Sequence, residues 1–233
     1  MPDFAIEDSL DLTSGAAIAG VDEVGRGPLA GPVTAAALLL DRAIDRDLAA
    51  SIDDSKRLSA TRRAALIPML QSVTVIGLGW ADRAEIDRLN ILGATMLAMR
   101  RAVDALAARI GRAPDFALID GNRNPGLGCP SRTVIKGDSV SLSIAAASVV
   151  AKVARDGAMA ELAEQFPGYG WERNAGYGTR EHIDALNRLG LTPEHRRSFA
   201  PVRAALESRG IGIQHNTGKF QESQPLYVVR KIL

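Results

Sequence analysis

The sequence predicts an α/β domain in which helices pack against one mixed sheet. Three apolar, β-prone runs with short connections come first, and this favours an antiparallel meander. The apolar spacing then changes to that of a helix, and two further short strands alternate with helices. Because strands that first pair with each other are followed by strands that alternate with helices, we expect a single central sheet of five strands.

The first half of the chain supplies the predicted meander. Residues 16–24 form an apolar run that leads into the letters DEVGRG. Residues 31–40 form the second run, with a proline near its start, where a strand tolerates one. Residues 72–80 (SVTVIGLGW) form the third and are rich in β-branched side chains.

The second half predicts the helices and the last two strands. Residues 115–120 (DFALID) and 132–136 (RTVIK) are typical of short strands. Helices are expected over four ranges, which are 82–110, 140–166, 179–189 and 201–208. Gly111 supplies a stop for the first of these helices, and the pair Pro167-Gly168 ends the second.

The length of 233 residues is that of one large domain, or of one domain plus a small extension. We expect residues 1–14 to be a flexible N-terminal arm and residues 15–210 to be the folded domain, including its C-terminal helices. Residues 211–233 lack a clear periodicity, and we predict that they form a tail.

Composition excludes several classes of protein. The 28 basic and 27 acidic residues give a net charge of +1, so a strongly basic nucleic-acid-binding coat is absent, although a local patch would suffice for binding. Cys129 is the only cysteine, which excludes an intramolecular disulfide and an all-cysteine zinc cluster. The sequence has no long uncharged apolar stretch, and its acidic N-terminus lacks the order of a secretion signal. We therefore expect a cytoplasmic protein that does not enter a membrane.

Three of the predicted strands end in acidic residues. Asp22 and Glu23 close the first strand, Asp120 closes the fourth, and Asp138 follows the fifth. Each has an ordinary explanation when taken alone, as the polar end of a strand, the start of a turn or a helix cap. If the strands are neighbours, however, four carboxylates meet at one edge of the sheet.

Such a cluster predicts a site for divalent cations. Unpaired carboxylates repel each other and raise one another's pKa values, whereas a hard cation that prefers oxygen ligands makes the arrangement favourable. We expect no histidine or cysteine beside these carboxylates to make this a zinc site, so the cluster points to Mg²⁺ or Mn²⁺. Two such ions about 4 Å apart can activate water and stabilise the leaving oxygen of a phosphodiester.

Six short motifs occur between residues 16 and 203. They are GVDEVGRGPLAGPV (20–33), DSK (54–56), DGN (120–122), KGD (136–138), AAASVVAKVARD (145–156) and AGYGTREH (175–182). In composition and in order they resemble the motifs of bacterial ribonuclease HII. The resemblance implies a ribonuclease H-like fold with a five-stranded mixed sheet flanked by helices and a helical C-terminal part.

The resemblance also implies an activity. It is that of a metal-dependent endonuclease, which hydrolyses the RNA strand of RNA–DNA hybrids and cuts on the 5′ side of single ribonucleotides in duplex DNA, leaving a 3′-hydroxyl and a 5′-phosphate. Its two-metal mechanism would use Mn²⁺ or Mg²⁺. By their places in the motifs, the metal-binding and catalytic residues would be Asp22, Glu23, Asp120 and Asp138.

The implied substrate-binding residues lie in three of the motifs. Gly25, Arg26 and Gly27 would sense the ribose 2′-hydroxyl, the group that distinguishes RNA from DNA, and Tyr177 would stack against the next sugar. Lys56 would contact a phosphate. We find no sliding-clamp-binding peptide at the C-terminus and expect a monomer whose partners are the RNA–DNA hybrid and ribonucleotide-containing DNA.

Several motif residues have two explanations. Ser143 and Ser148 could contact phosphate or simply pack within a helix, and His182 could touch the substrate backbone or be structural. Arg196 and Arg197 could bind phosphates or form a solvated basic turn.

Two further features bear on the resemblance. Ala175 stands where many members of that family have lysine, which would remove one phosphate contact. The spacing Gly25-x-Gly27-x-x-Ala30 also imitates a dinucleotide-binding fingerprint. That fingerprint needs a helix to start at the second glycine, and Pro32 would interrupt it.

Overall fold

The computed structural model describes residues 1–52 and 58–208, and its centre is a five-stranded mixed sheet with the strand order β3-β2-β1-β4-β5. The strands are β1 (Ile18–Val24), β2 (Val33–Leu40), β3 (Thr74–Ala81), β4 (Phe116–Asp120) and β5 (Ser131–Val134). The pairs β1–β2 and β2–β3 are antiparallel, which confirms the predicted meander, whereas β1–β4 and β4–β5 are parallel. The expected five-stranded mixed sheet is therefore confirmed, with β1 at its centre.

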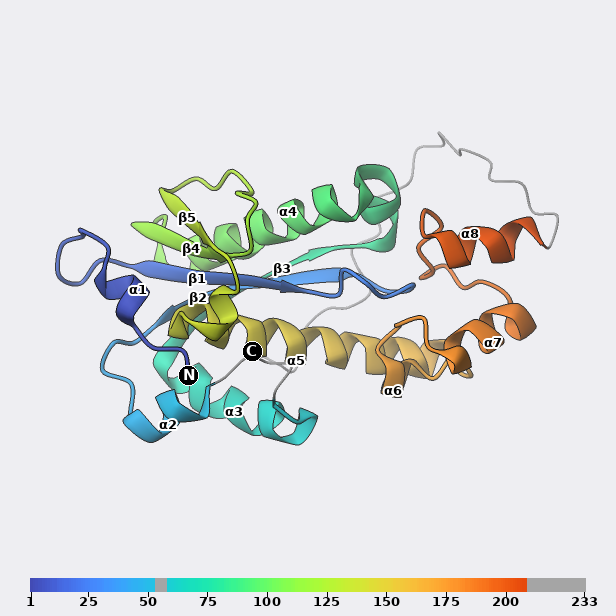
Figure 1. The fold of residues 1–233 in the computed structure, drawn as a ribbon, viewed down its shortest axis with the longest axis horizontal. Coiled ribbons are helices and arrows are strands. Elements are labelled where there is room, and N and C mark those ends of the chain that lie inside the picture. The colour runs from blue at the N-terminus through green and yellow to red at the C-terminus, as the bar shows by residue number, and fades with distance from the viewer. Residues whose placement is uncertain (53–57, 209–233) are drawn as a thin grey trace.

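Two long helices cover the two faces of this sheet (Figure 1). Helix α4 (Arg83–Ile110) packs on one face and α5 (Leu142–Gln165) on the other. The side chains of β2 alternate between the two layers, with Ala35 and Ala37 in the α4 layer and Ala36 and Leu38 in the α5 layer. A strand buried on both faces has apolar residues at every position, and this explains the continuous apolar run of β2.

Glycines let the helices approach the sheet closely. A Cβ on Gly20 of β1 would lie 2.2 Å from the backbone carbon of Ser143 in α5. A Cβ on Gly77 or Gly79 of β3 would lie 2.2 Å or 2.1 Å from a backbone oxygen of α4. The backbone of each long helix thus occupies the space that a side chain would need.

The predicted ends of these helices are close to those observed. Asp82 and Glu85 form a capping box at the start of α4, and Gly111 ends that helix in the left-handed conformation. Asn90 interrupts α4 with a φ of 58°, and its side chain accepts hydrogen bonds from the amides of Leu92 and Gly93, so it recaps the second part of the helix. The apolar spacing did not reveal this break.

Two helices were missed between the second and third strands. They are α2 (Arg46–Ser51) and α3 (Ala60–Val73). Pro68 lies inside α3, and the buried residues Leu66, Ile67 and Leu70 occupy only part of its length. A helix with an internal proline and few buried apolar positions gives a weak periodic signal, although these side chains pack into the same core as α5.

The N-terminal segment differs from the flexible arm that the sequence predicted. It contains helix α1 (Ala5–Asp8), and Glu7 is buried. One carboxylate oxygen of Glu7 accepts hydrogen bonds from the Ser141 hydroxyl at 2.7 Å and the Ser143 amide at 3.1 Å. Glu7 thus caps the start of α5, a long-range contact that local composition does not indicate.

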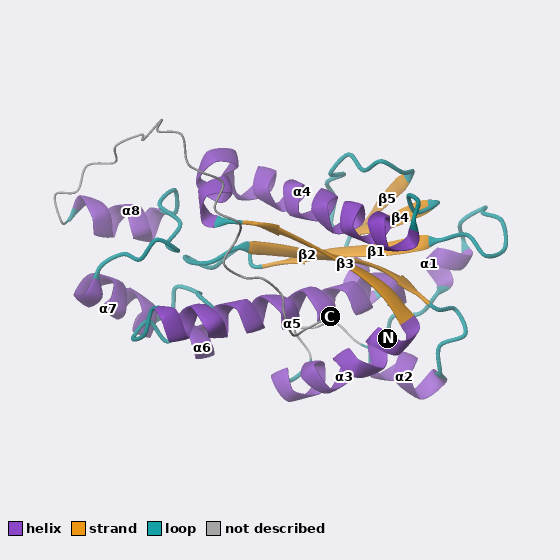
Figure 2. Cartoon of the chain, turned by 180° about the vertical axis from the view of Figure 1, so that it is seen from behind, coloured by secondary structure: helices purple, strands orange, loops and turns teal. Residues whose placement is uncertain are grey.

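The C-terminal helices form a separate group beyond one end of the sheet (Figures 1 and 2). They are α6 (Trp171–Asn174), α7 (Arg180–Leu189) and α8 (Ala200–Glu207). Trp171 packs with Met159 and Leu162, near the end of α5, in a small separate core. The predicted tail, 211–233, and the predicted domain boundary at 210 lie outside the described residues. In the described part of the chain, no helix is both long and apolar enough to cross a membrane.

Candidate metal centre and substrate loop

Three of the predicted carboxylates meet beside the centre of the sheet. Asp22 and Glu23 belong to β1, and Asp120 is the last residue of β4. The two strands are parallel neighbours with Val21 opposite Ile119, so Asp22 and Asp120 follow side by side. One carboxylate oxygen from each of Asp22, Glu23 and Asp120 lies within 4.8 Å of the other two. An all-oxygen donor set of this kind fits a hard divalent cation.

Strand β1 continues without a turn from Asp22 to Glu23. Strand β1 stays paired with β2 through Val24. Pairing with β4 ends at Val21, which leaves that edge of β1 open beside Glu23. The backbone amide of Glu23 also donates to Asp22 Oδ1 at 2.7 Å. The two carboxylates therefore converge at an open strand edge instead of at a bend.

Asp138 lies next to Asp120 but outside the group of three. It belongs to the short 3₁₀ helix η1 (Gly137–Ser139) that follows β5, and its side chain is buried. The amide of Gly137 donates to Asp120 Oδ1 at 2.6 Å, which ties η1 to the end of β4. All four predicted carboxylates are thus in one region, with Asp138 at its margin.

The cluster is electrostatically unfavourable in the absence of a cation. Burial, and then the charges of Glu23 and Asp120, hold the pKa of Asp22 well above its ordinary value, although a hydrogen bond from Ser148 partly opposes this. Burial also raises the pKa of Glu23, against the opposing effect of the Arg26 guanidinium 3.2 Å away. The pKa of Asp120 is raised by burial and by the charge of Asp138. A divalent cation would relieve this repulsion.

The glycine loop lies directly beside the carboxylates. Gly25 has a φ of +90°, and a Cβ on it would lie 2.0 Å from the side chain of Arg155, so this position requires glycine. A Cβ on Gly27 would lie 3.3 Å from the ring of Tyr177, which is therefore the neighbour of this residue. Tyr177 is 44 % exposed, and the Arg26 side chain is half exposed. The structure brings together four of the five predicted substrate-binding residues; Lys56 lies outside the described residues.

His182 is structural instead of substrate-facing. It is fully buried, and its Nδ1 lies 2.9 Å from the carbonyl oxygen of Tyr177, so Nδ1 carries the proton. Its Nε2 then accepts hydrogen bonds from Trp171 Nε1 and His195 Nε2, both at 3.1 Å. His195 Nδ1 in turn accepts from the amide of Thr192 at 2.9 Å. This network of two neutral imidazoles lies beneath Tyr177.

Arg196 matches neither of its two sequence explanations. It is fully buried, so it is neither a solvated turn nor a phosphate contact, whereas Arg197 is exposed. Arg155 is also fully buried, and it donates hydrogen bonds to the carbonyls of Ala30, Pro32 and Ala175. The sequence argument missed Arg155, and its only signal was an arginine within an alanine- and valine-rich helix.

The two serines of α5 have different places. The Ser148 side chain forms a hydrogen bond with Asp22, whereas Ser143 is buried against β1 and its amide donates to Glu7.

The dinucleotide-binding alternative is excluded, because the residues after Gly27 lead into β2, which runs antiparallel to β1, and no helix starts there.

The family model described as ribonuclease HII matches residues 19–202, a range that contains the carboxylates, the glycine loop and Tyr177. The chain belongs to the ribonuclease HII family. The ribonucleases HII of Paramagnetospirillum magneticum and Rhodospirillum rubrum are both 59 % identical to it. The first match covers 87 % of this chain and 97 % of the relative, and the second covers 88 % and 92 %.

Solved structures support the ribonuclease H-like fold. Ribonuclease H2 from Pyrococcus horikoshii has a TM-score of 0.67 at 24 % identity, and the match covers 84 % of this ribonuclease HII chain and 99 % of that one. Bst-RNase HIII in complex with Mn²⁺ has a TM-score of 0.70 at 20 % identity, with 88 % and 81 % covered. At these identities the likeness concerns the fold, and the family rests on the sequence matches.

Proposed function

We propose that this ribonuclease HII chain hydrolyses the RNA strand of RNA–DNA hybrids and cuts on the 5′ side of single ribonucleotides in duplex DNA, leaving a 3′-hydroxyl and a 5′-phosphate. The observation that carries the proposal is the convergence of Asp22, Glu23 and Asp120 within 4.8 Å, directly beside the glycine loop and Tyr177. Family membership supports the same activity.

Asp22, Glu23, Asp120 and Asp138 would hold Mn²⁺ or Mg²⁺. When bound, these ions supply water activation and charge stabilisation for phosphodiester hydrolysis. The chain itself contributes a prearranged set of oxygens, because Ser148 orients Asp22 and the Gly137 amide orients Asp120. Burial and mutual repulsion, which raise the pKa values of Asp22, Glu23 and Asp120, disfavour the empty cluster in its ionised form, and a bound cation would relieve that repulsion.

Ribose recognition is assigned to Gly25, Arg26 and Gly27, together with Tyr177. Backbone groups of a glycine loop can approach a 2′-hydroxyl without a Cβ between them. Tyr177 lies over Gly27 and presents a partly exposed ring, which is suited to stacking on the next sugar. Lys56, within the DSK motif, is assigned to a phosphate contact on its sequence position alone. We further propose that the enzyme acts as a monomer.

The test uses a labelled DNA duplex that contains one ribonucleotide. We expect cleavage with Mn²⁺ or Mg²⁺, a product end at the 5′ side of the ribonucleotide, and no cleavage in a chelator. An all-DNA duplex of the same sequence is the substrate control. Asp104→Ala, an exposed change on α4, is the protein control and should retain full activity. Cleavage that persists in the chelator, or that occurs equally in the all-DNA duplex, would contradict the proposal.

A further inference from the structure

Arg196 binds the glycine loop at both of its ends. Its Nη2 donates to the carbonyl of Gly25 at 2.7 Å, and its Nη1 donates to that of Arg26 at 3.1 Å. At the other end of the loop, Nε donates to Gly31 at 2.9 Å and Nη2 to Pro32 at 2.9 Å. One side chain therefore fixes the separation between the start and the end of the loop.

Only an arginine can make this set of contacts. The planar guanidinium presents several N–H donors in a fixed fork and stays charged even when buried. The four carbonyl dipoles point their negative ends at this charge, which offsets much of the cost of burying it. A lysine at position 196 would bring a single ammonium group, which cannot reach both ends of the loop at once.

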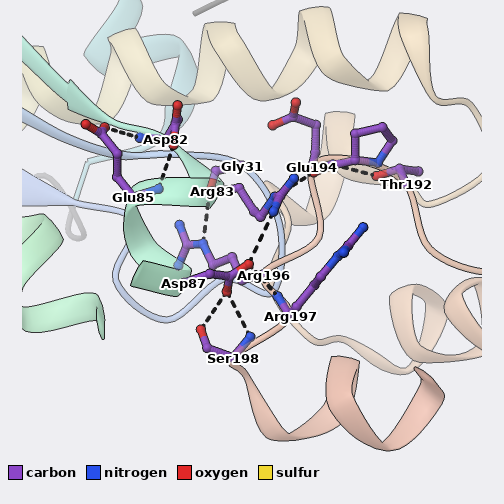
Figure 3. Close-up of polar contacts among 11 residues, drawn as sticks. Gly31, Asp82, Arg83, Glu85, Asp87, Thr192, Glu194, Arg196, Arg197 and Ser198 are labelled. Carbon is purple, nitrogen blue, oxygen red and sulfur yellow. Dashed lines mark hydrogen bonds and ion pairs between the residues drawn. The ribbon is translucent and has the colours of Figure 1, made fainter. Parts of the chain in front are cut away.

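The chain on either side of Arg196 is held by helix α4 (Figure 3). Arg83 Nε donates to the carbonyl of Pro193 at 2.8 Å. Asp87 accepts hydrogen bonds from the amide of Arg197 at 3.2 Å and from both the amide and the hydroxyl of Ser198, at 2.8 Å and 2.7 Å. The segment 193–198 is thus tied to α4 on either side of Arg196.

We propose that Arg196 is a positioning residue, which sets the glycine loop at the correct distance from the metal-binding carboxylates, and that Asp87 supports it from α4. This inference rests on the proposed function, because the loop is the ribose reader there. Arg196 has no part in holding cations. Its loss should therefore separate cleavage from metal binding, which a general structural defect would not do.

The experiment compares Arg196→Lys and Asp87→Ala with wild type in the full chain. Kinetics are measured on the duplex with one ribonucleotide, and Mn²⁺ affinity is measured by calorimetric titration without substrate. For Arg196→Lys we expect kcat to fall about 10²-fold, since a displacement of about 1 Å can cost this much. For Asp87→Ala we expect about a tenfold fall, typical of lost support behind a functional group. Mn²⁺ affinity should be unchanged in both variants, because Arg196 and Asp87 are not among the gathered carboxylates.

Two exposed positions supply matched controls. Arg203→Lys on α8 and Asp104→Ala on α4 make the same chemical changes away from the loop, and both should behave as wild type. Hydrogen exchange adds a readout that needs no substrate. Amides of residues 26–31 should exchange at least about tenfold faster in both test variants, while those of β1 and α5 are unchanged.

These readouts separate the possible outcomes. Wild-type kcat and wild-type loop exchange in a folded Arg196→Lys protein would overturn the inference, and so would a parallel loss of cleavage and Mn²⁺ affinity. If Arg196→Lys does not fold, Asp87→Ala decides by the same criteria. If the wild-type protein does not cut the ribonucleotide duplex, the proposed function fails, and the exchange data still test whether Arg196 orders the loop.

Discussion

Asp22 is the carboxylate whose ionisation the fold opposes most clearly, since burial and two neighbouring carboxylates act together. We expect Asp22→Asn to lower cleavage by orders of magnitude because a metal ligand is lost. In chelator at pH 7.5 the variant should be more stable than wild type, and the difference should shrink towards pH 4. The folded pKa is raised, so the ionised form costs stability above it and the protonated form does not. Urea unfolding at both pH values measures this, and a less stable variant at pH 7.5 would contradict it.

The buried His195 gives a pH dependence of the opposite sign. Burial and the neighbouring His182 lower the pKa of His195 to about 3. Below pH 6.5 the unfolded chain binds a proton that the folded chain does not, so stability falls as the pH falls. From pH 7 to pH 5 this loss is about 2 kcal/mol. His195→Gln should not show this loss of stability. The carboxylates are present in both proteins, so their contribution to the pH dependence cancels in the comparison. Identical pH dependence of urea unfolding in the two proteins would refute this.

Tyr177 is predicted to act through its ring. Tyr177→Ala should slow cleavage at isolated ribonucleotides, because about 1–3 kcal/mol of stacking free energy is lost. Tyr177→Phe, which keeps the ring, is the matched control and should stay close to wild type. The measurement is the ratio of single-ribonucleotide cleavage to hybrid cleavage. If that ratio were the same in Tyr177→Ala and Tyr177→Phe, the stacking role would be wrong.

Site residues differed in how far the sequence could predict them. The carboxylates were predictable because strand ends and motif letters both pointed to them. Arg196 was not, because an arginine beside another arginine is usually solvated, and its four acceptors are backbone carbonyls, which leave no mark in the sequence. His182 was likewise ambiguous, because its partner His195 becomes a neighbour only when the C-terminal helices pack.

At the scale of elements, the close packing of β3 on α4 predicts that a larger residue at Gly79 destabilises the protein. Gly79→Ala would place a Cβ 2.1 Å from the carbonyl oxygen of Ala98, in rigid helix backbone. We expect a loss of about 1–3 kcal/mol in the free energy of unfolding, as for other overpacked cores. Gly128→Ala, which has open space around it, should change stability by less than about 0.5 kcal/mol. Equal stability of the two variants in urea would show that the helix shifts freely.

The strands and long helices were predictable because their apolar residues repeat with the correct period. Helix α3 was not, since Pro68 and a short buried face hide its period. The break at Asn90 escaped for a different reason. Both parts of α4 pack on the same face of the sheet, so the apolar spacing continues across it. The periodicity of apolar residues thus predicted the strands of the sheet better than it predicted the irregularities within the helices.

At the scale of the whole molecule, we expect cation binding to increase the free energy of unfolding. A ligand that binds only the folded state at 100 times its Kd adds about 2.7 kcal/mol. We expect Mn²⁺ to raise the Tm of the wild-type protein, whereas it should have little effect on Asp22→Asn, in which a neutral amide replaces one of the three gathered carboxylates. Thermal unfolding with and without Mn²⁺ measures both. An equal rise in Tm in the two proteins would mean that Mn²⁺ does not bind at Asp22.

The tie between Glu7 and the start of α5 has a consequence for biosynthesis. The two bonded side chains, Glu7 and Ser141, are 134 positions apart. Glu7 therefore leaves the ribosome well before its partner has been translated, and it stays solvated in the nascent polypeptide. Because so distant a contact must close a long loop, we expect the amino-terminal segment to dock after the sheet and α5 have assembled.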